Sequence, residues 1–245
     1  MMLALRSALF NLAFYAVIVA MLLLGLPVLA SRRLTLAYAK LWGRVSVWLL
    51  EAICGTRLSF EGVVPRGGAL IAAKHQSFLE TFALLTVLER PTYVLKRELT
   101  WLPLFGWYLL RSGMIPIDRG AGTKTFARLN ARAAEAVAAG RQLIIFPEGT
   151  RRPPGAIPAY KSGVAHLYRA LGAPCTPVAL DTGVFWPRRK FLRRPGRAVI
   201  RFLDTIPPGL DRTAFMVRAQ AAIESASDAL LAAEAPVAAA EARPA

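Results

Sequence analysis

Short apolar runs alternate with longer helix-like segments along most of the chain that follows Thr56. Such short runs are typical of buried strands, and their alternation with helices is typical of strands joined by helical connections. We expect strands at residues 58–60, 70–73, 93–95, 115–117, 143–146, 176–180 and 199–203. The pattern predicts an α/β domain with a largely parallel central sheet that is flanked by helices.

Two further segments have the pattern of helices with recognisable ends. Residues 123–139 precede Gly140, a typical residue beyond a helix C-terminus, and residues 211–231 begin with Asp211, a favourable N-cap. A chain of 245 residues has room for one well-buried domain, which we place at residues 56–231. The last stretch, residues 232–245, is rich in alanine, glutamate and proline and predicts a disordered tail.

The N-terminal part of the chain contains a long uncharged segment. No charged residue occurs from Ser7 to Ser31, and this length is enough to cross a hydrocarbon core of roughly 30 Å. A signal peptide is the alternative, because residues 28–30 resemble a cleavage site. The apolar region is longer than the roughly 7 to 15 residues that are usual for such peptides. We therefore expect residues 1–55 to form membrane-anchoring helices.

The positive charges after this segment predict its orientation. Arg32, Arg33, Lys40 and Arg44 follow it, so the positive-inside rule places the rest of the chain on the cytoplasmic side of the inner membrane. The sequence leaves open whether the segment spans the bilayer or lies in one leaflet. It also leaves open whether residues 36–53, which mix aromatic, aliphatic and basic side chains, form an interfacial helix or a helix packed in the core.

The chain combines a formal net charge of +16 with a hydrophobic fraction of 55%. This combination favours a protein held against an anionic membrane surface. Nucleic acid is the competing partner for so much positive charge. The sequence has no zinc-finger spacing, no aromatic strand signature of an RNA-binding domain and no basic zipper, so nucleic acid binding is not expected.

A run of basic residues follows the sixth predicted strand. Seven basic residues and no acidic residue lie between Thr182 and Leu203, interleaved with aromatic side chains. We expect this run to form a surface for anionic headgroups, with a plain solvated face as the alternative. The seven residues are Arg188, Arg189, Lys190, Arg193, Arg194, Arg197 and Arg201.

Cys54 and Cys175 are the only cysteines of the chain. Two cysteines are too few for a disulfide framework, and these two do not have the spacing of a metal site. We expect both to be buried, reduced thiols, and the sequence predicts neither a metal nor another cofactor.

One of the two histidines stands near a carboxylate where a helix is expected to begin. Glu80 follows His75 by five positions, and an imidazole that a carboxylate holds in one tautomer is suited to take a proton from a hydroxyl. A structural interpretation is compatible with this one, because Ser77 and Glu80 match a capping box, with Ser77 as N-cap and Glu80 at the third helical position. His166, the other histidine, lies in a helix-like stretch at 161–171 and is interpreted as structural.

Chemically informative residues follow four of the predicted strands. In open α/β sheets, ligands bind beyond the carboxyl ends of the strands, so these segments are expected to share one crevice. In chain order they are His75, Lys96, Asp118 with Arg119, and Glu148 to Arg151.

These segments, in this order, resemble the sequence blocks of the glycerolipid acyltransferases, in particular the 1-acylglycerol-3-phosphate acyltransferases. The first block of that family is a histidine, four residues and an aspartate, whereas here Glu80 takes the place of the aspartate after His75. Residues 96–119 resemble the second block and its lead-in. The third block is matched without a change by Phe-Pro-Glu-Gly-Thr-Arg at 146–151, and residues 176–180 resemble the fourth.

The resemblance implies roles for individual residues. His75 would remove the proton from the free hydroxyl of a lysophospholipid, which then attacks an acyl thioester, and Glu80 would orient His75 and balance its charge. Arg119 matches the family's phosphate-binding arginine, and Lys96 is a candidate second cation. The remaining substrate-binding candidates, without separate roles, are Glu148, Gly149, Thr150 and Arg151.

The resemblance also implies the partners. The expected donor is acyl-CoA or an acyl carrier protein, whose phosphates are a second candidate ligand for the basic run, and the expected acceptor is lysophosphatidic acid, which would become phosphatidic acid. Another lysolipid, such as lyso-ornithine lipid, would use the same chemistry. The alternative from a different class is a noncatalytic, membrane-anchored lipid-binding protein on the same fold.

Overall fold

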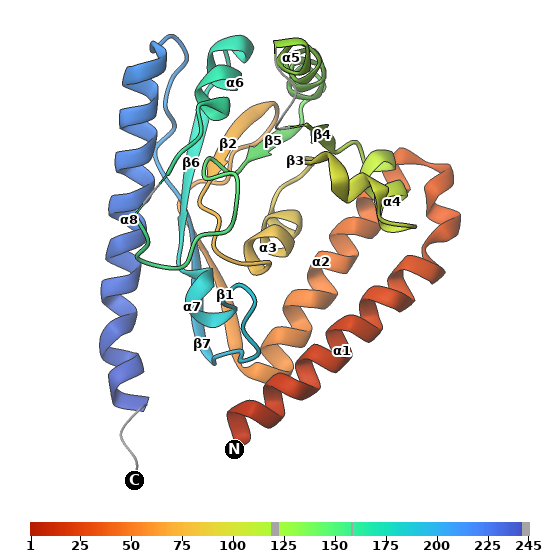
Figure 1. Ribbon diagram of the computed structural model, residues 1–245, viewed down its shortest axis with the longest axis vertical. Coiled ribbons are helices and arrows are strands. Elements are labelled where there is room, and N and C mark those ends of the chain that lie inside the picture. Colours follow the sequence, from red (N-terminus) through yellow and green to blue (C-terminus); the bar gives the residue numbers. More distant parts are fainter. Residues whose placement is uncertain (119–122, 158, 242–245) are drawn as a thin grey trace.

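A seven-stranded sheet forms the centre of the computed structural model, which describes residues 1–118, 123–157 and 159–241 (Figure 1). The strand order is β1-β7-β6-β2-β5-β3-β4, and every neighbouring pair is parallel except β6 and β7. This confirms the predicted fold class and, within a few residues at each end, the predicted strands. Their bounds are β1 Thr56–Glu61, β2 Ala69–Ala73, β3 Pro91–Lys96, β4 Ile115–Ile117, β5 Gln142–Ile145, β6 Cys175–Leu180 and β7 Gly196–Phe202.

Helices cover both faces of the sheet, because its central strands are apolar on both sides. In β2, Leu70 packs in one hydrophobic core and Ile71 in the other, since successive side chains of a strand point to opposite faces. The helices on the Leu70 side are α5 Thr123–Ala138, α6 Gly163–Leu171 and α8 Arg212–Glu241, and the helix on the Ile71 side is α3 Leu79–Val87 (Figure 1).

The C-terminal helix α8 is longer than the sequence predicted. It begins as expected after Asp211, whose Oδ1 accepts hydrogen bonds from the amides of Thr213 and Ala214 at 2.7 and 2.9 Å. The helix continues to Glu241, so residues 232–241 are helical where a disordered tail was expected. Alanine and glutamate are strong helix formers and favour this extension, whereas Pro236 within it disfavours a helix. Residues 242–245 lie outside the described part of the chain.

The N-terminal residues form a helical hairpin beside the sheet, made of α1 Met2–Leu24, the short 3₁₀ helix η1 Leu26–Ala30 and α2 Arg32–Cys54 (Figure 1). Of the two alternatives for the second helix, the structure has the core-packed one, because Trp42 and Leu50 are buried. Gly55 ends α2 in the left-handed conformation with φ of 73°, and β1 follows directly.

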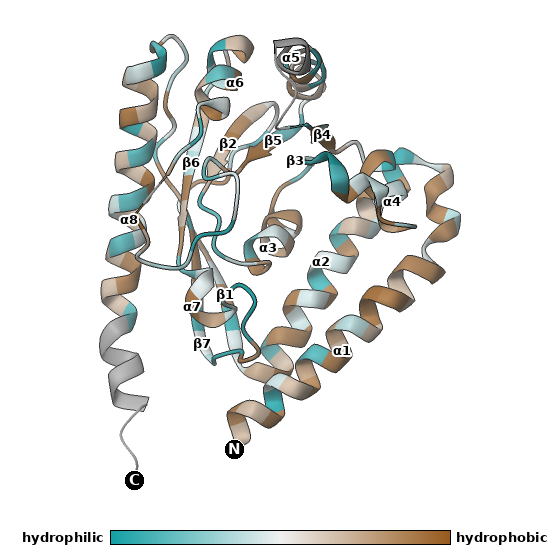
Figure 2. Cartoon of the chain, viewed as in Figure 1, coloured by the Kyte–Doolittle hydropathy of each residue, from teal (hydrophilic) through white to brown (hydrophobic). Residues whose placement is uncertain are grey.

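Helix α1 is predominantly apolar along its whole length (Figure 2). It reaches a mean hydropathy of 2.3, and among the described residues it is the one helix long and apolar enough to cross a membrane. Its buried side contributes Phe10 and Phe14 to a third hydrophobic cluster with Leu50 and Trp186. Most of the helix nevertheless faces outward, with Leu5, Leu9, Leu12, Tyr15, Val19 and Leu23 exposed.

Three short helices lie near the carboxyl ends of the strands: η2 Arg97–Trp101, α4 Phe105–Arg111 and α7 Thr182–Phe185. Both cysteines are buried and unpaired, as predicted. In the described ranges, no group of three or more His, Cys, Asp or Glu residues is arranged to hold a metal ion.

Candidate active site

His75 and Glu80 are in direct contact in the loop between β2 and the first turn of α3. His75 Nδ1 lies 2.8 Å from Glu80 Oε1. The Glu80 side chain is fully buried, whereas that of His75 is 17% exposed. A carboxylate only accepts hydrogen bonds, so Nδ1 carries the proton and Nε2 keeps its lone pair. This is the tautomer that a general base needs.

The same carboxylate also caps the start of α3. Glu80 Oε1 accepts hydrogen bonds from the amides of Gln76 and Ser77 at 2.8 and 2.7 Å, and Ser77 Oγ accepts one from the amide of Leu79 at 3.0 Å. The glutamate half of the predicted capping box is therefore present, but Ser77 Oγ bonds the amide two residues on rather than three, and the N-cap is Phe78 rather than the predicted Ser77. The helix begins at Leu79, so Glu80 lies at its second position rather than the predicted third. One carboxylate serves both the imidazole and the helix terminus.

The second oxygen of Glu80 has a partner that the sequence did not suggest. Thr182 Oγ1, at the start of α7, donates a hydrogen bond of 2.6 Å to Glu80 Oε2, and both residues are fully buried. The only sequence signal for Thr182 was its position just beyond β6, where the resemblance to the fourth block ends. No side-chain oxygen of Glu80 therefore lacks a donor.

The loop after β5 packs against His75 from the other side. The Phe146 ring stacks on the imidazole with centroids 3.9 Å apart and an interplanar angle of 13°. Glu148 Oε1 accepts a hydrogen bond of 3.1 Å from the His75 amide, while the His75 carbonyl accepts one of 2.8 Å from the Arg152 amide. The predicted base therefore contacts the third sequence block through its imidazole ring and through its backbone amide.

Glu148 is a buried carboxyl group rather than a solvated one. Only 1% of the residue is exposed, and burial raises its pKa to about 7, although the His75 amide and the nearby charge of Lys74 act in the opposite direction. Its Oε2 is buried and has no hydrogen-bond partner among the described residues. The position favours the role of fixing the loop, because its one hydrogen-bonded oxygen holds the backbone beside the imidazole.

Thr150 and Arg151 lie on the same loop, held by an arginine from beyond α7. Arg188 Nη1 donates to the Arg151 carbonyl at 2.9 Å and to Thr150 Oγ1 at 3.3 Å. The Arg151 guanidinium lies 4.0 Å from the centre of the Phe78 ring. Burial and the charge of Arg188 lower the pKa of Arg151. Gly149 turns the loop with φ of 66°, a value that favours glycine.

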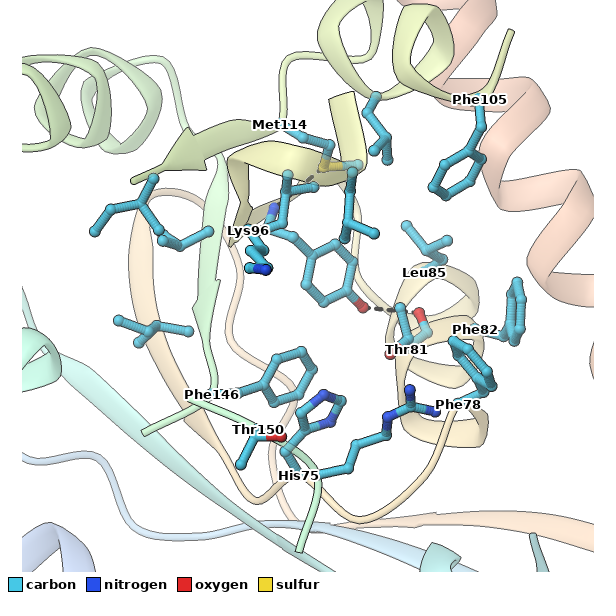
Figure 3. Close-up of a pocket in the computed structure, with 18 of the residues that line it drawn as sticks. His75, Phe78, Thr81, Phe82, Leu85, Lys96, Phe105, Met114, Phe146 and Thr150 are labelled. Atoms are coloured by element: carbon cyan, nitrogen blue, oxygen red, sulfur yellow. Dashed lines mark hydrogen bonds between the residues drawn. The ribbon is translucent and has the colours of Figure 1, made fainter. Parts of the chain in front are cut away.

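A cavity of about 1390 Å³ opens beside His75 (Figure 3). It is lined by His75 and by five more of the predicted site residues: Lys96, Glu148, Gly149, Thr150 and Arg151. In Figure 3, His75 and Thr150 lie at one end of the pocket and Phe105 at the opposite end. Much of the remaining wall is apolar or aromatic and comes from four helices, with Ile18 and Leu22 of α1, Trp42 of α2, Phe82 and Leu85 of α3, and Phe105 of α4.

The other predicted residues have different positions. The Lys96 ammonium forms an ion pair of 2.9 Å with Glu98, so a phosphate would have to compete for it. Arg119 lies outside the described residues. His166 is exposed on α6, where its Nε2 lies 3.0 Å from Asn130 Nδ2, and it does not line the cavity.

The basic run between β6 and β7 is more strongly engaged with the protein than a headgroup surface would be. Arg193 is buried beside α1, and Arg188 holds the loop after β5. Arg197 and Arg201 both pair with Glu61, at 3.2 and 2.8 Å. In the described part of the chain, the exposed residues of the run whose side chains form no hydrogen bond or ion pair are Arg189, Lys190 and Arg194.

Comparison with known proteins identifies relatives of this chain. The acyltransferase family profile matches residues 57–181. A 1-acyl-sn-glycerol-3-phosphate acyltransferase of Pseudomonas aeruginosa is 34% identical over 172 residues, covering 69% of this chain and 67% of the relative. A lyso-ornithine lipid O-acyltransferase of the same species is 33% identical over 205 residues, covering 75% of this chain and 78% of the relative.

A solved structure shares the fold. The crystal structure of the 1-acyl-sn-glycerophosphate (LPA) acyltransferase PlsC from Thermotoga maritima superposes with a TM-score of 0.77, covering 98% of each chain at 19% sequence identity. At this identity the likeness shows the fold alone, whereas the family profile extends over half of the chain. On the sequence match and the relatives together, this chain belongs to the acyltransferase family and is an acyl-transferring enzyme.

Proposed function

We propose that the protein transfers an acyl chain from an acyl thioester to the sn-2 hydroxyl of lysophosphatidic acid and so forms phosphatidic acid. The observation that carries the proposal is the His75–Glu80 pair, whose imidazole lines one end of a large apolar cavity (Figure 3). The pair supplies a base in the required tautomer, and the cavity has the size and lining to hold an acyl chain.

The chemistry needs no nucleophile from the protein. His75 Nε2 takes the proton of the acceptor hydroxyl, and the hydroxyl oxygen attacks the thioester carbonyl carbon. The carbon–sulfur bond then breaks, and the imidazolium returns its proton to the departing thiolate. Glu80 balances the imidazolium charge, and its burial keeps that interaction away from water.

The polar end of the cavity suits an anionic headgroup. Arg151 lines the cavity beside His75, and a guanidinium can donate two parallel hydrogen bonds to a phosphate. Lys96 would contribute only by exchanging its ion pair with Glu98. Arg119 stays a candidate for the acceptor phosphate on the evidence of the sequence alone.

A second acceptor has support from one specific observation. The relative named lyso-ornithine lipid O-acyltransferase is almost as similar to this chain as the first relative and is matched over more of its length. The reaction at His75 would be identical, because a hydroxyl is acylated in either case. The acceptor therefore has to be determined by measurement.

We also propose that the protein works at the inner membrane, with its sheet domain on the cytoplasmic side. The exposed apolar side of α1 supports membrane association, and the basic residues after it support the orientation. The substrate and the product are membrane lipids, so such a location would bring the cavity to them.

The test measures thiol release from acyl-CoA by membranes that contain the protein, with lysophosphatidic acid, lyso-ornithine lipid or no acceptor. We expect release that depends on lysophosphatidic acid and that falls at least about a hundredfold in His75→Ala, the low end of what a positioned base contributes. His166→Ala is the matched control, because this second histidine lies outside the cavity lining, and it should retain the parent rate.

Each other outcome has a distinct meaning. An unchanged rate in His75→Ala would end the proposed mechanism. Release with lyso-ornithine lipid alone would keep the mechanism and change the acceptor. The noncatalytic alternative would be favoured by two results together. No acceptor would give release, either from acyl-CoA or from an acyl carrier protein as donor, and lipid binding would survive His75→Ala.

A further inference from the structure

The hydrogen bond between Thr182 and Glu80 links two segments that are far apart in the sequence. The two residues are 102 positions apart, and their oxygens are 2.6 Å apart in a fully buried environment. The other carboxylate oxygen accepts from the amides of Gln76 and Ser77 and from the imidazole of His75. Among the residues that the structure describes, Thr182 is thus the one side-chain donor to the oxygen that does not face His75.

We propose that Thr182 is a positioning residue of the active site, which orients Glu80 and through it His75. The inference rests on the proposed function, in which His75 is the base. Thr182 does not touch the reacting atoms, and its hydroxyl acts on them through the carboxylate alone.

Such a residue is useful because a carboxylate at the end of a flexible side chain has to be oriented, and glutamate has one more rotatable bond than aspartate. Rotation about the last bond of a glutamate is broad and roughly two-fold, so the carboxylate plane is poorly defined without external partners. A donor on each oxygen fixes this plane, and Thr182 supplies the donor on the outer one. The related blocks carry aspartate here, and we infer that the Thr182 contact is what allows Glu80 to work in its place.

The segment that carries Thr182 is itself firmly attached. Asp181 Oδ1 accepts a hydrogen bond of 2.7 Å from the amide of Val199 in β7, which fixes the start of α7 to the sheet. The Gly183 amide donates to Gln76 Oε1 at 3.0 Å. A side chain at Gly183 would put its Cβ 2.8 Å from Gln76 Cβ, so the two segments approach as closely as glycine permits.

A further hydrogen bond joins the His75 loop to the C-terminal end of α7. Ser77 Oγ donates a hydrogen bond of 2.6 Å to the Trp186 carbonyl, one turn beyond Thr182. The loop that holds His75 is therefore joined to the α7 segment at Gly183 and at Trp186, and Thr182 directly precedes the first of these contacts. A hydroxyl held in this way can orient a carboxylate without moving itself.

The first experiment replaces the hydroxyl without changing the shape of the side chain. We expect Thr182→Val to lower kcat at least about tenfold while KM for the acceptor stays within about twofold, because the base is misaligned but the pocket is intact. Thr182→Ser keeps the hydroxyl and should retain most of the parent kcat. An unchanged kcat in Thr182→Val, or an equal loss in Thr182→Ser, would overturn the proposal.

A matched control lies on β6, the strand that leads into α7. Thr176 in β6 is also buried, and its hydroxyl lies 3.1 Å from that of Thr205. This pair of hydroxyls is separate from the hydrogen bonds of the Glu80 carboxylate. Thr176→Val therefore removes a buried threonine hydroxyl from the preceding element without touching the proposed contact. Its kcat should equal that of the parent, and a loss as large as that of Thr182→Val would mean that the effect is a general one on packing.

The second experiment tests the link to the length of Glu80. An aspartate at this position has a shorter arm, which cannot reach both His75 and Thr182, so Glu80→Asp should lower kcat. Thr182→Val should then lower the rate of Glu80→Asp by less than about twofold, because the contact is already lost and the two changes are coupled. Losses that multiply in the double variant, or a fully active Glu80→Asp, would show that Thr182 does not act through the longer side chain.

A third readout does not depend on turnover. Only two imidazoles give signals in protein labelled with ¹⁵N-histidine, and His75→Ala assigns them. An imidazole N–H donated to a carboxylate gives a strongly downfield proton signal, which should shift or broaden in Thr182→Val and persist in Thr182→Ser and Thr176→Val. An unchanged signal in Thr182→Val would overturn the proposal. Because this readout needs no substrate, it separates failure of the Thr182 role from failure of the proposed function.

Discussion

The carboxyl group of Glu148 is the site residue with the clearest consequence for pH. Its pKa is raised from the usual 4.5 to about 7 by burial. Between these two pH values the folded protein keeps a proton that the unfolded chain releases. The free energy of unfolding therefore falls as the pH rises through this window, by up to about 3 kcal/mol for a shift of this size.

Replacing Glu148 by glutamine should remove this part of the pH dependence, because the amide does not ionise. We expect the melting temperature of Glu148→Gln, relative to that of the parent, to be higher at pH 8 than at pH 5.5. Any constant cost of the amide cancels in this comparison. The pKa of Asp181 is also raised to about 7 by burial, so part of the dependence remains in the variant.

Glu89→Gln serves as the control, because the side chain of Glu89 is 56% exposed. Its melting temperature should follow that of the parent at both pH values. If the difference between Glu148→Gln and the parent were the same at pH 5.5 and pH 8, the carboxyl group of Glu148 would not be the source of the pH dependence.

At the scale of elements, one arginine joins α1 to the sheet domain. The Arg193 guanidinium lies 5.0 Å from the Trp186 ring, and its Nη2 donates to Asn11 Oδ1 at 2.9 Å. We expect Arg193→Ala to lower the free energy of unfolding by about 2 to 4 kcal/mol, because buried hydrogen bonds and a cation–π contact are lost together. The measurement is a thermal melt in detergent, with limited proteolysis of α1 as a local readout.

Arg194 provides the matched control for this prediction. It is the next residue in the chain and carries the same charge, but it is exposed. Arg194→Ala should melt with the parent and protect α1 equally well. Equal losses in the two variants would indicate that charge, rather than the buried contact, determines the attachment of α1.

The elements also show which parts of the structure could be predicted from the sequence. The strands were predictable because they are buried on both faces and so leave continuous apolar runs. The contact between His75 and Glu80 was predictable because both belong to one helix start. The contacts of Thr182 and Arg188 join residues 102 and 38 positions apart, and no local pattern encodes them. The burial of Arg193 could not be predicted for the same reason, since it depends on contact with α1.

At the scale of the whole molecule, α1 is fastened to the domain near its middle and near its C-terminal end. Asn11 is held by Arg193, and the Leu22 carbonyl accepts a hydrogen bond of 2.9 Å from the hydroxyl of Tyr108 in α4. The helix therefore lies along the domain rather than projecting from it (Figure 1). Asn11 and Leu22 are separated by about 16 Å along the helix, so a spanning α1 would place Asn11, and with it the Arg193 contact of the domain, near the middle of a hydrocarbon core of about 30 Å. The geometry favours a helix that lies in one leaflet with its exposed apolar side in lipid.

Cysteine labelling in membrane vesicles distinguishes the two arrangements. The native thiols are suited to a silent background, because burial raises the pKa of Cys54 to about 11 and that of Cys175 to about 12. A single cysteine is introduced at Met2, before α1 enters its contacts, or at Val63, an exposed loop residue of the domain.

In inside-out vesicles we expect a membrane-impermeant maleimide to label Met2→Cys and Val63→Cys alike without detergent, because both positions lie on the cytoplasmic side of a one-leaflet helix. A different result would be that Val63→Cys is labelled and Met2→Cys reacts only after permeabilisation. This result would mean that α1 spans the bilayer and that its contacts with the domain are rearranged in the membrane. Labelling of both positions only from the outer side of intact cells would keep the one-leaflet helix and reverse the proposed orientation. The two introduced cysteines thus test two properties of α1 separately. Whether α1 spans the bilayer determines whether both cysteines react from the same side, and the orientation of the protein determines which side that is.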